Sequence, residues 1–271
     1  MDITRDEFNK LSHFVKSNFG INLTEKKITL VTSRLNKIIT QENFKSFDDY
    51  YKFVVSDSTG ERVAELLNRI TTNHTFFNRE KLHFDYLRDH ILPDLRIRHE
   101  HERDLRIWSA GCSTGDEAFT ISMLLFETFG FKKNDWDMKI LATDISTDAL
   151  EKAQKGLYKT EQIDKLPVAW QNKYFKKHSS ENYIISEEIR DNVIFRRFNL
   201  MNDFPFRKKF DVIFCRNVMI YFDRYTKEQL INRFYHTSAE GGYLFIGHSE
   251  TLDKAKTPYK YIMPAIYRKV R

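Results

Sequence analysis

Carboxylates placed after predicted strands are the groups of this chain with the clearest potential for chemistry. The segment WSAGCSTGDE joins a glycine turn to Glu117, and glycines let a ligand approach the backbone at the start of a helix. A second carboxylate, Asp144, ends the strand-like run KILAT, where it can accept hydrogen bonds from both hydroxyls of a ribose. The structural alternatives are a simple glycine turn and a helix cap at Asp144. Found together, the two carboxylates favour a nucleoside-binding pocket.

The glycine pattern restricts which nucleoside would fit. The chain has neither GxGxxG, which packs a pyrophosphate against a helix, nor the phosphate loop GxxxxGK[ST]. A carboxylate directly after the glycine turn would repel phosphate, whereas Glu117 suits a ligand that carries an ammonium group. A ribose and an ammonium group without phosphate describe S-adenosylmethionine.

A sheet is needed to bring these groups together, and residues 105–271 alternate between strand and helix patterns. The expected strands are 105–108, 138–143, 193–199, 211–215, 243–247 and 259–267. This alternation predicts an α/β fold with a parallel sheet covered on both faces, and the last two strands predict one antiparallel edge pair. Because ligands of parallel sheets bind at the carboxyl ends of the strands, we expect Asn199, Arg216 and Asn217 near Asp144 and Glu117.

The first 70 residues have a different pattern, typical of a small helical bundle. Four amphipathic helices are expected, at 2–19, at 24–39 with Thr24 as N-cap, after Ser46, and after Gly60. A further helix at 80–102 should be bent or interrupted at Pro93, because proline removes a backbone donor.

One segment, at about 157–192, does not fit the strand–helix alternation. It contains an expected helix at 168–175 and a strand at 183–186 that should pair with 188–190. We read it as a small β insert on the sheet. The expected organisation is therefore a helical domain at 1–70, a linker at 71–80, and an α/β domain at 81–271.

Composition limits the class of protein. Of the 271 residues, 41% are hydrophobic, and no apolar run approaches the roughly 20 residues that cross a bilayer. The charged start MDITRDEFNK lacks the apolar core of a signal peptide, and the two cysteines do not form a disulfide framework. We therefore expect a cytoplasmic protein. The net charge of +6 fits either an acidic partner or solubility alone.

In combination and order, six segments across the chain resemble the CheR family of chemotaxis receptor methyltransferases. They are TTNHTFFNRE, WSAGCSTGDE, ATDIS, NVIFRRFNL, FDVIFCRNVMIYFD and GGYLFIGHSE. The resemblance implies a class I S-adenosylmethionine-dependent methyltransferase, with a Rossmann-like mixed sheet, a small all-α domain in front and a β subdomain inserted. It also implies methyl transfer to glutamate side chains of chemoreceptors, giving γ-methyl esters and S-adenosylhomocysteine.

The resemblance implies roles for individual residues. Those matching the cofactor-contacting linker are Asn73, Thr75 and Arg79. Glu117 would hold the methionine ammonium group and Asp144 the ribose, while Asn199 and Leu200 would flank the adenine. The last group would lie near the reacting methyl: Arg216, Asn217 and Tyr221. Arg79 would either pair with the cofactor carboxylate or lie beside the reacting group. The structural alternatives are an ion pair of Arg79 with Glu80 or Asp85, and simple aromatic packing of Tyr221.

Partners are implied in the same way. The second expected helix carries a basic set that could dock acidic receptor helices or could simply be solvated: Lys26, Lys27, Arg34 and Lys37. Some family members tether a receptor C-terminal pentapeptide with a glycine-containing loop, but the matching stretch 176–182 has no glycine, so we expect no tethering. The resemblance also implies a monomer, and we expect no metal.

Two other function classes stay open. A nucleic-acid methyltransferase would suit the basic charge, but such enzymes usually carry an Asn/Asp-Pro-Pro-aromatic motif where this chain has Arg216-Asn217-Val218-Met219, and no basic groove interleaved with aromatics is evident. We therefore expect no nucleic-acid partner. A non-catalytic module that senses the cofactor or docks on signalling proteins is the second class, and the full set of ligand-facing residues argues against it.

Overall fold

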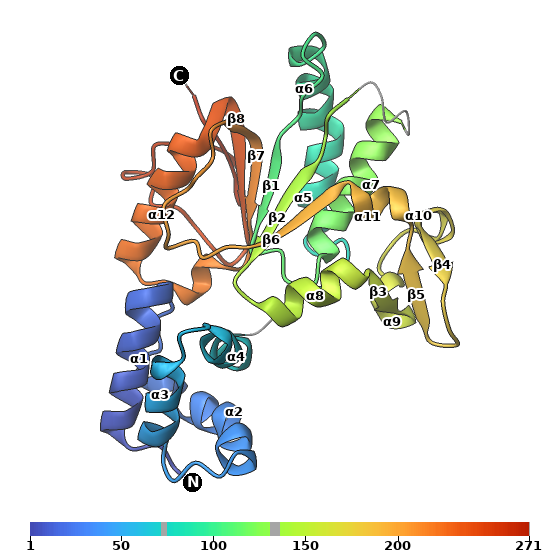
Figure 1. The fold of residues 1–271 in the computed structure, drawn as a ribbon. Helices are drawn as coiled ribbons and strands as arrows, with labels where there is room; N and C mark the ends of the chain where they lie inside the picture. Colours follow the sequence, from blue (N-terminus) through green and yellow to red (C-terminus); the bar gives the residue numbers. More distant parts are fainter. Residues whose placement is uncertain (72–74, 131–135, 271) are drawn as a thin grey trace.

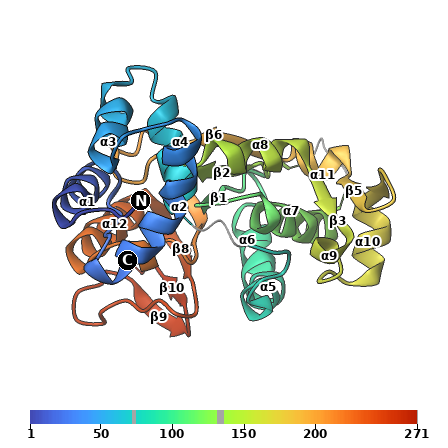
Figure 2. The same ribbon diagram turned by 90° about the horizontal axis from the view of Figure 1, so that it is seen from below.

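The computed structural model describes residues 1–71, 75–130 and 136–270. Its helical domain, the α/β domain and the β subdomain are distinct in Figure 1, and the helical domain and β subdomain lie at opposite sides of the molecule in Figure 2. No helix among the described residues is long and apolar enough to span a membrane.

The four predicted N-terminal helices are present. They are α1 (Arg5–Phe19), α2 (Ile28–Gln41), α3 (Phe47–Ser56) and α4 (Glu61–Ile70). Thr4 and Glu7 form a capping box at the start of α1, and the Ser46 hydroxyl caps α3 as predicted. Thr24 instead precedes a short 3-10 turn, η1 (Glu25–Lys27), without a side-chain cap.

The main sheet has seven strands in the order β6-β2-β1-β7-β8-β10-β9. The parallel strands are β1 (Ile107–Ala110), β2 (Ile140–Asp144), β6 (Val193–Arg197), β7 (Phe210–Cys215) and β8 (Ser238–Ile246). The predicted last strand at 259–267 is wrong as a single strand, because it folds back on itself as a hairpin. Its two arms, β9 (Lys260–Met263) and β10 (Ile266–Arg268), are antiparallel to each other, and β10 is antiparallel to β8.

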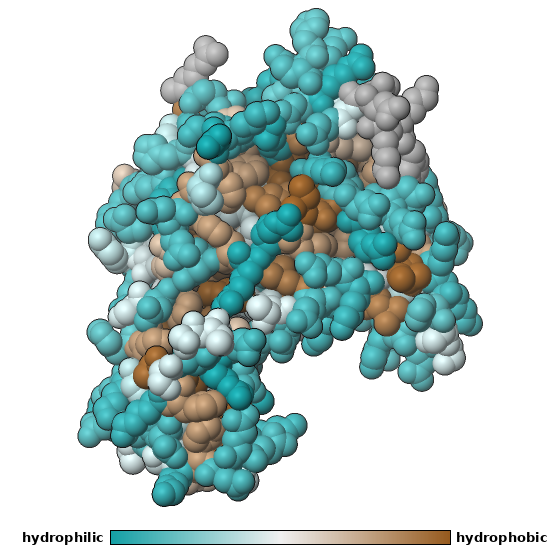
Figure 3. Space-filling model, viewed as in Figure 1, coloured by the Kyte–Doolittle hydropathy of each residue, from teal (hydrophilic) through white to brown (hydrophobic). Residues whose placement is uncertain are grey.

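Helices cover both faces of this sheet. One face carries α5 (Lys81–Tyr86), η2 (Leu87–Ile91), α6 (Leu92–Arg98) and α7 (Asp116–Phe129), and the other carries α12 (Arg224–Thr237). Successive residues of β1 contribute to opposite faces of the sheet: Ile107 belongs to the hydrophobic cluster that includes α7, while Trp108 packs against Phe234 of α12. Figure 3 shows hydrophobic residues gathered near the centre of one face, over the β6 edge.

The predicted helix at 80–102 is only partly correct. It ends at Arg98, and it contains a π-helical segment at Leu87–Ile91. Pro93 is the second residue of α6, which follows directly on the π-helical segment, so the regular α-helix is interrupted next to the proline. Helix α8 (Thr147–Lys155) then follows β2, as predicted.

The insert forms a three-stranded antiparallel sheet in the order β3-β5-β4. Its elements are β3 (Leu157–Lys159), α9 (Thr160–Ile163), α10 (Val168–Tyr174), β4 (Phe175–Lys177), β5 (Asn182–Ile185) and α11 (Glu187–Asp191). The predicted pairing of 183–186 with 188–190 is wrong. The latter residues are helical because Ile189 is buried against the main domain, and β5 pairs with β3 and β4 instead.

Candidate active site

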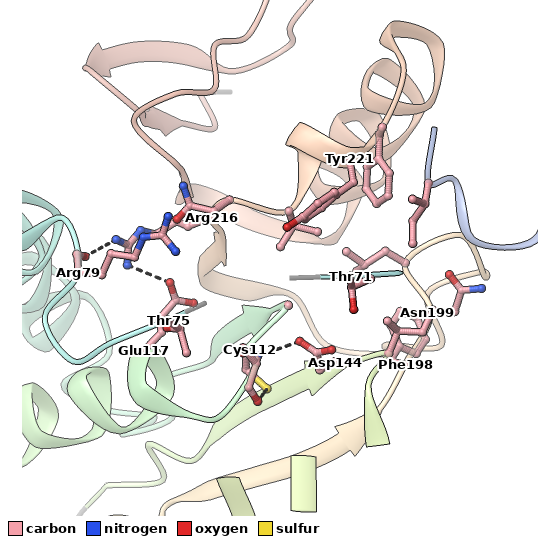
Figure 4. A pocket seen from close by; sticks show the side chains of 18 of the residues that line it. Thr71, Thr75, Arg79, Cys112, Glu117, Asp144, Phe198, Asn199, Arg216 and Tyr221 are labelled. Atoms are coloured by element: carbon pink, nitrogen blue, oxygen red, sulfur yellow. Dashed lines mark hydrogen bonds and ion pairs between the residues drawn. The ribbon is translucent and has the colours of Figure 1, made fainter. Parts of the chain in front are cut away.

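A cavity with about 1010 Å³ of empty space, partly open to solvent, lies at the carboxyl ends of β1, β2, β6 and β7. The cavity is lined by the predicted residues that the structure describes, namely Thr75, Arg79, Glu117, Asp144, Asn199, Leu200, Arg216, Asn217 and Tyr221. Asn73 lies outside the described residues. Figure 4 shows that Asp144 and Asn199 lie at one end of the cavity, and that Arg79, Glu117 and Arg216 lie at the other.

The glycine turn after β1 is shaped mainly by close packing. Gly111 has a φ of +86°, and a Cβ there would lie 2.3 Å from Cγ2 of Val218. Gly115 has a φ of +89°, and a Cβ there would lie 3.0 Å from the Cβ of Ala153. The first glycine therefore lets the loop after β7 lie against the turn, and the second lets α8 approach it.

Backbone amides hold Asp144 in place. Its Oδ2 accepts a hydrogen bond from the Ser113 N–H at 2.8 Å, and its Oδ1 accepts one from the Ser146 N–H at 2.9 Å. Ser146, not Asp144, caps α8, because its hydroxyl accepts from the Ala149 N–H. Burial raises the pKa of Asp144, and the backbone N–H groups oppose that effect. Each oxygen keeps a lone pair with which it can accept a ligand hydroxyl.

Three charged side chains form what we call the Arg216 network: Glu80, Glu117 and Arg216. The Arg216 side chain is only 3% exposed, with Nη1 2.9 Å from Oε2 of Glu117 and Nη2 3.2 Å from Oε2 of Glu80. It also donates to the backbone carbonyl of Arg79, and the Ser109 hydroxyl donates to Glu117 at 2.7 Å. The guanidinium group is thus shared by two carboxylates.

The two carboxylates of this network respond oppositely to their surroundings. Burial raises the pKa of Glu117, and the Arg216 guanidinium only partly offsets it. Burial opposes ionisation of Glu80 too, but there the guanidinium of Arg216 wins and lowers the pKa. With both carboxylates ionised, the network carries a net charge of −1, since two negative groups share one positive group.

In the sequence analysis, Glu80 appears only as an alternative ion-pair partner of Arg79. Its carboxylate instead pairs with Arg216, and Asp85 pairs with Lys81 and Arg88. The Arg79 guanidinium lines the cavity, with its carbon 5.9 Å from the centroid of the Phe76 ring. The motif TTNHTFFNRE contained the signal, because its last two residues place a carboxylate next to a site cation.

Glu250 is a second residue that the sequence analysis missed. Its buried carboxylate accepts hydrogen bonds from the backbone N–H groups of Asn217 and Ile220, both at 3.0 Å, and of Gly247 at 2.6 Å. It therefore holds the loop after β7 that carries Arg216 and Asn217. Asn217 needs such support, since its φ is +58°, and its side-chain amide donates to Glu80 at 3.3 Å. A carboxylate shortly after the apolar run YLFIG was the available signal.

The helical domain closes one wall of the cavity. Phe19, Ile21 and Thr71 line it, and Ile21 forms a β-bridge with Phe222. The Asn199 side-chain amide donates to the carbonyl of Asn18 at 2.8 Å, so this predicted adenine neighbour also joins the two domains.

Basic residues of the expected docking helix have unequal environments. Arg34 donates to the carbonyls of Ile70 at 2.8 Å and Thr71 at 3.1 Å, so it has a structural role at the end of α4. The Lys27 ammonium lies 5.6 Å from the centroid of the Tyr221 ring, at the cavity wall. Lys26 and Lys37 are exposed.

A nucleoside-type cavity in a sheet of this kind defines an α/β protein of the S-adenosylmethionine-dependent methyltransferase class, and comparison with known proteins identifies the family. The model of the CheR methyltransferase all-alpha domain matches residues 6–71, and that of the CheR methyltransferase SAM binding domain matches residues 73–267. The chain therefore belongs to the CheR methyltransferase family.

Relatives match along nearly the whole chain. The chemotaxis protein methyltransferase of Borreliella burgdorferi is 44% identical over 99% of this chain and 96% of its own length. That of Escherichia coli K12 is 34% identical over 90% of this chain and 83% of its own. The solved structure of the glycopeptide N-methyltransferase MtfA with S-adenosylhomocysteine is a distant likeness, with 13% identity and a TM-score of 0.32 over 52% of this chain and 42% of that one.

S-adenosylmethionine is the cofactor of this family's binding domain, and the cavity's donor set fits it. Asp144 and Glu117 offer acceptor oxygens for hydroxyl and ammonium groups. With all side chains ionised, the lining residues and Glu80 sum to −1, from Glu80, Glu117 and Asp144 against Arg79 and Arg216. That charge complements a cofactor whose sulfonium, ammonium and carboxylate groups sum to +1.

Proposed function

We propose that this protein transfers a methyl group from S-adenosylmethionine to glutamate side chains of chemoreceptors. The observation that carries the proposal is that Asp144, at the end of β2, and Glu117, in the first turn of the helix after β1, line one cavity together with Arg79. When bound, the cofactor supplies a sulfonium-bound methyl group, which a glutamate oxygen takes to give a γ-methyl ester and S-adenosylhomocysteine.

The chain's own residues bind and orient the cofactor in this proposal. Asp144 accepts from the ribose hydroxyls, since Ser113 and Ser146 already hold its carboxylate in a fixed orientation. Glu117 accepts from the methionine ammonium group with the lone pairs left by Ser109 and Arg216. Asn199 and Leu200 flank the adenine, while Thr75, together with Asn73, contacts the cofactor from the linker.

No general base is required for this reaction. A free glutamate has a pKa of about 4.3, so the attacking carboxylate is already ionised at neutral pH. The reaction removes one positive and one negative charge, and a cavity that excludes water favours it because opposite charges lose hydration on entry. The protein's contribution is therefore alignment.

Arg79 is proposed to orient the acceptor carboxylate, together with Tyr221. A close grip by a cation would stabilise the negative charge of the nucleophile and so slow its attack. Asn217 and Arg216 form the floor beneath the methyl group, and the carboxylates that share Arg216 keep that guanidinium away from the acceptor.

The test is transfer of labelled methyl groups to receptor-containing membranes, followed by assay for base-labile methyl esters. Wild type should give them, Arg79→Ala and Asp144→Ala should fold but lose transfer, and Asp164→Ala, an exposed carboxylate outside the cavity, should match wild type. Near-normal transfer by both site variants would disprove the site. Label on nucleic acid, or cofactor binding without any transfer, would support the competing functions.

We further propose that exposed lysines of the helical domain, Lys26 and Lys37, dock the acidic receptor helices. Because Arg34 caps α4, charge reversal there would damage the fold, so the informative variant is Lys26→Glu with Lys37→Glu. Compared with wild type, the apparent affinity of this variant for receptor should be several-fold lower at low salt. At high salt the difference should shrink, because the charges are screened. Lys155→Glu, also exposed, is the control. Unchanged affinity of the double variant would show that these lysines are only solvated.

The hairpin between β4 and β5 is proposed not to tether a receptor peptide. Its loop is closed by the Asn182 carbonyl, which accepts from the N–H groups of His178 and Ser179. Calorimetry with a receptor C-terminal pentapeptide should show no saturable heat, and tight binding would overturn this expectation.

A further inference from the structure

Three potential metal ligands meet beside the Arg216 network. They are Glu80, which precedes α5, His83 in the first turn of α5, and His248, which follows β8. One nitrogen from each histidine and one carboxylate oxygen of Glu80 all lie within 4.8 Å of one another. This finding differs from the sequence analysis, which expected no metal.

His83 is the unusual member of this cluster. Its side chain is fully buried, and neither ring nitrogen has a hydrogen-bond partner among the described residues. Buried polar atoms are nearly always paired, so an imidazole placed this way requires an explanation. The ring lies edge-to-face with that of His248, with centroids 4.5 Å apart, and against Phe245 on another side.

The spacing suits a small ion. Nδ1 of His83 lies 3.5 Å from Oε2 of Glu80, close to the separation of two ligands that each lie about 2.0–2.1 Å from a tetrahedral ion. His248 is exposed, so its side chain can turn toward the other two and leave a fourth position for water. Two imidazoles and one carboxylate are ligands that zinc and similar divalent transition ions accept.

Local charge also favours a cation. Glu80 and Glu117 share the single guanidinium of Arg216, so the network has one negative charge in excess. We propose that Glu80, His83 and His248 bind a divalent transition ion of the zinc class, and that this ion and S-adenosylmethionine oppose each other's binding.

The antagonism follows from the shared guanidinium. An ion that draws the Glu80 carboxylate to itself leaves Arg216 to pair with Glu117 alone, and the positive charge near Glu117 then rises. A cofactor ammonium group at Glu117 would meet that charge. This part rests on the proposed role of Glu117, whereas the metal site itself does not. Linkage makes the effect reciprocal, so the cofactor product should weaken metal binding by the same factor as the metal weakens product binding.

Calorimetric titration of the full chain, without a polyhistidine tag, with zinc chloride tests the site. We expect one ion per chain, and at least about tenfold weaker binding for His248→Ala, which removes the one exposed ligand of the three. His101→Ala, another exposed histidine, should bind zinc like wild type. Cobalt(II) should give visible bands typical of nitrogen and oxygen ligands, without thiolate charge transfer from the two buried cysteines.

Absence of saturable zinc binding, or equal binding by His248→Ala and wild type, would overturn the proposal. Saturating S-adenosylhomocysteine should weaken zinc binding in wild type, and zinc should weaken product binding in wild type but not in His248→Ala. Failure of the protein to bind S-adenosylhomocysteine at all would count against the proposed function while leaving the metal titration to decide the site. Independent binding of the two ligands would overturn the antagonism alone.

Discussion

The two ends of the cavity hold their carboxylates in different ways. Asp144 is fixed by backbone N–H groups of the turns that follow β1 and β2. Glu117 is fixed by a side chain, Arg216, which it shares with Glu80 from a third segment. One end is therefore set by local backbone geometry, and the other by a balance of charges from distant parts of the chain. We therefore expect a substitution of Asp144 to cost less stability than removal of one member of the Arg216 network, because that removal should destabilise the other two members.

The strongest test of this contrast is removal of the shared cation. Arg216→Ala would leave two carboxylates facing each other in a largely buried place, and breaking a buried ion pair costs about 3–5 kcal/mol. We expect a loss of that order in the free energy of unfolding, measured by denaturant titration. Arg197→Ala, at the exposed end of β6, should change it by less than about 0.5 kcal/mol. A similarly small change for Arg216→Ala would show that the network is not a unit.

Asp144→Asn tests the other end. Asparagine keeps one acceptor oxygen, so one of the two backbone donors, Ser113 or Ser146, loses its partner. We expect a loss of stability of about 1–3 kcal/mol, smaller than for Arg216→Ala, and the charge-assisted bonds to a ribose are also weakened. Hydrogen bonds to charged groups contribute about 1.5–3 kcal/mol, so S-adenosylhomocysteine should bind about 10–100-fold more weakly by calorimetry. A large loss of stability with normal product affinity would reverse the assignment of this end.

Glu250→Gln asks whether the charged end also depends on its supporting loop. Glutamine offers one acceptor oxygen in place of two, so one side of the clamp on Asn217 and Ile220 loosens. We expect kcat to fall about tenfold while the affinity for S-adenosylhomocysteine stays within about threefold, because the loop would lose alignment more than binding contacts. Equal losses in kcat and product affinity would indicate a general defect of the cavity.

The pH dependence should be the smallest effect. Burial raises the pKa of both Glu117 and Asp144. On acidification each carboxylate therefore becomes protonated at a pH above its ordinary pKa, which for Glu117 would be 4.5. Affinity for S-adenosylhomocysteine should therefore decline before the pH has fallen to 4.5. The Glu117→Gln variant should bind more weakly than wild type, but its affinity should change less with pH. Affinity that stays constant down to pH 4.5 would contradict an ionised Glu117 at the ammonium group.

Residues that act through local sequence were the predictable part of this molecule. The Ser46 cap of α3, the strand ends and the place of Asp144 follow from patterns a few residues long, whereas the predicted cap at Thr24 is absent. The strand ends bring Asp144 and its neighbours to one edge of the sheet. Glu80 and Glu250 were not predicted, because Glu80 pairs with Arg216 and Glu250 holds the backbone of Asn217 and Ile220, which are 30 or more positions away in the chain. The proposed metal site likewise needs His248, which is 168 positions from Glu80. The final hairpin was missed for a different reason. The turn between β9 and β10 has no glycine, and Ala265 adopts a φ of +65° there.

Packing is continuous across the domain boundary near residue 71, because one hydrophobic cluster contains residues of both the N-terminal helices and the sheet. Gly20, at the end of α1, has a φ of +72°, and a Cβ there would lie 2.5 Å from the sulfur of Met201. The backbone of one domain thus lies directly on the side chains of the other, next to the Asn18–Asn199 bond. The two domains are not interchangeable modules, since exchanging the helical domain for another would remove the part of the cavity wall formed by Phe19, Ile21 and Thr71.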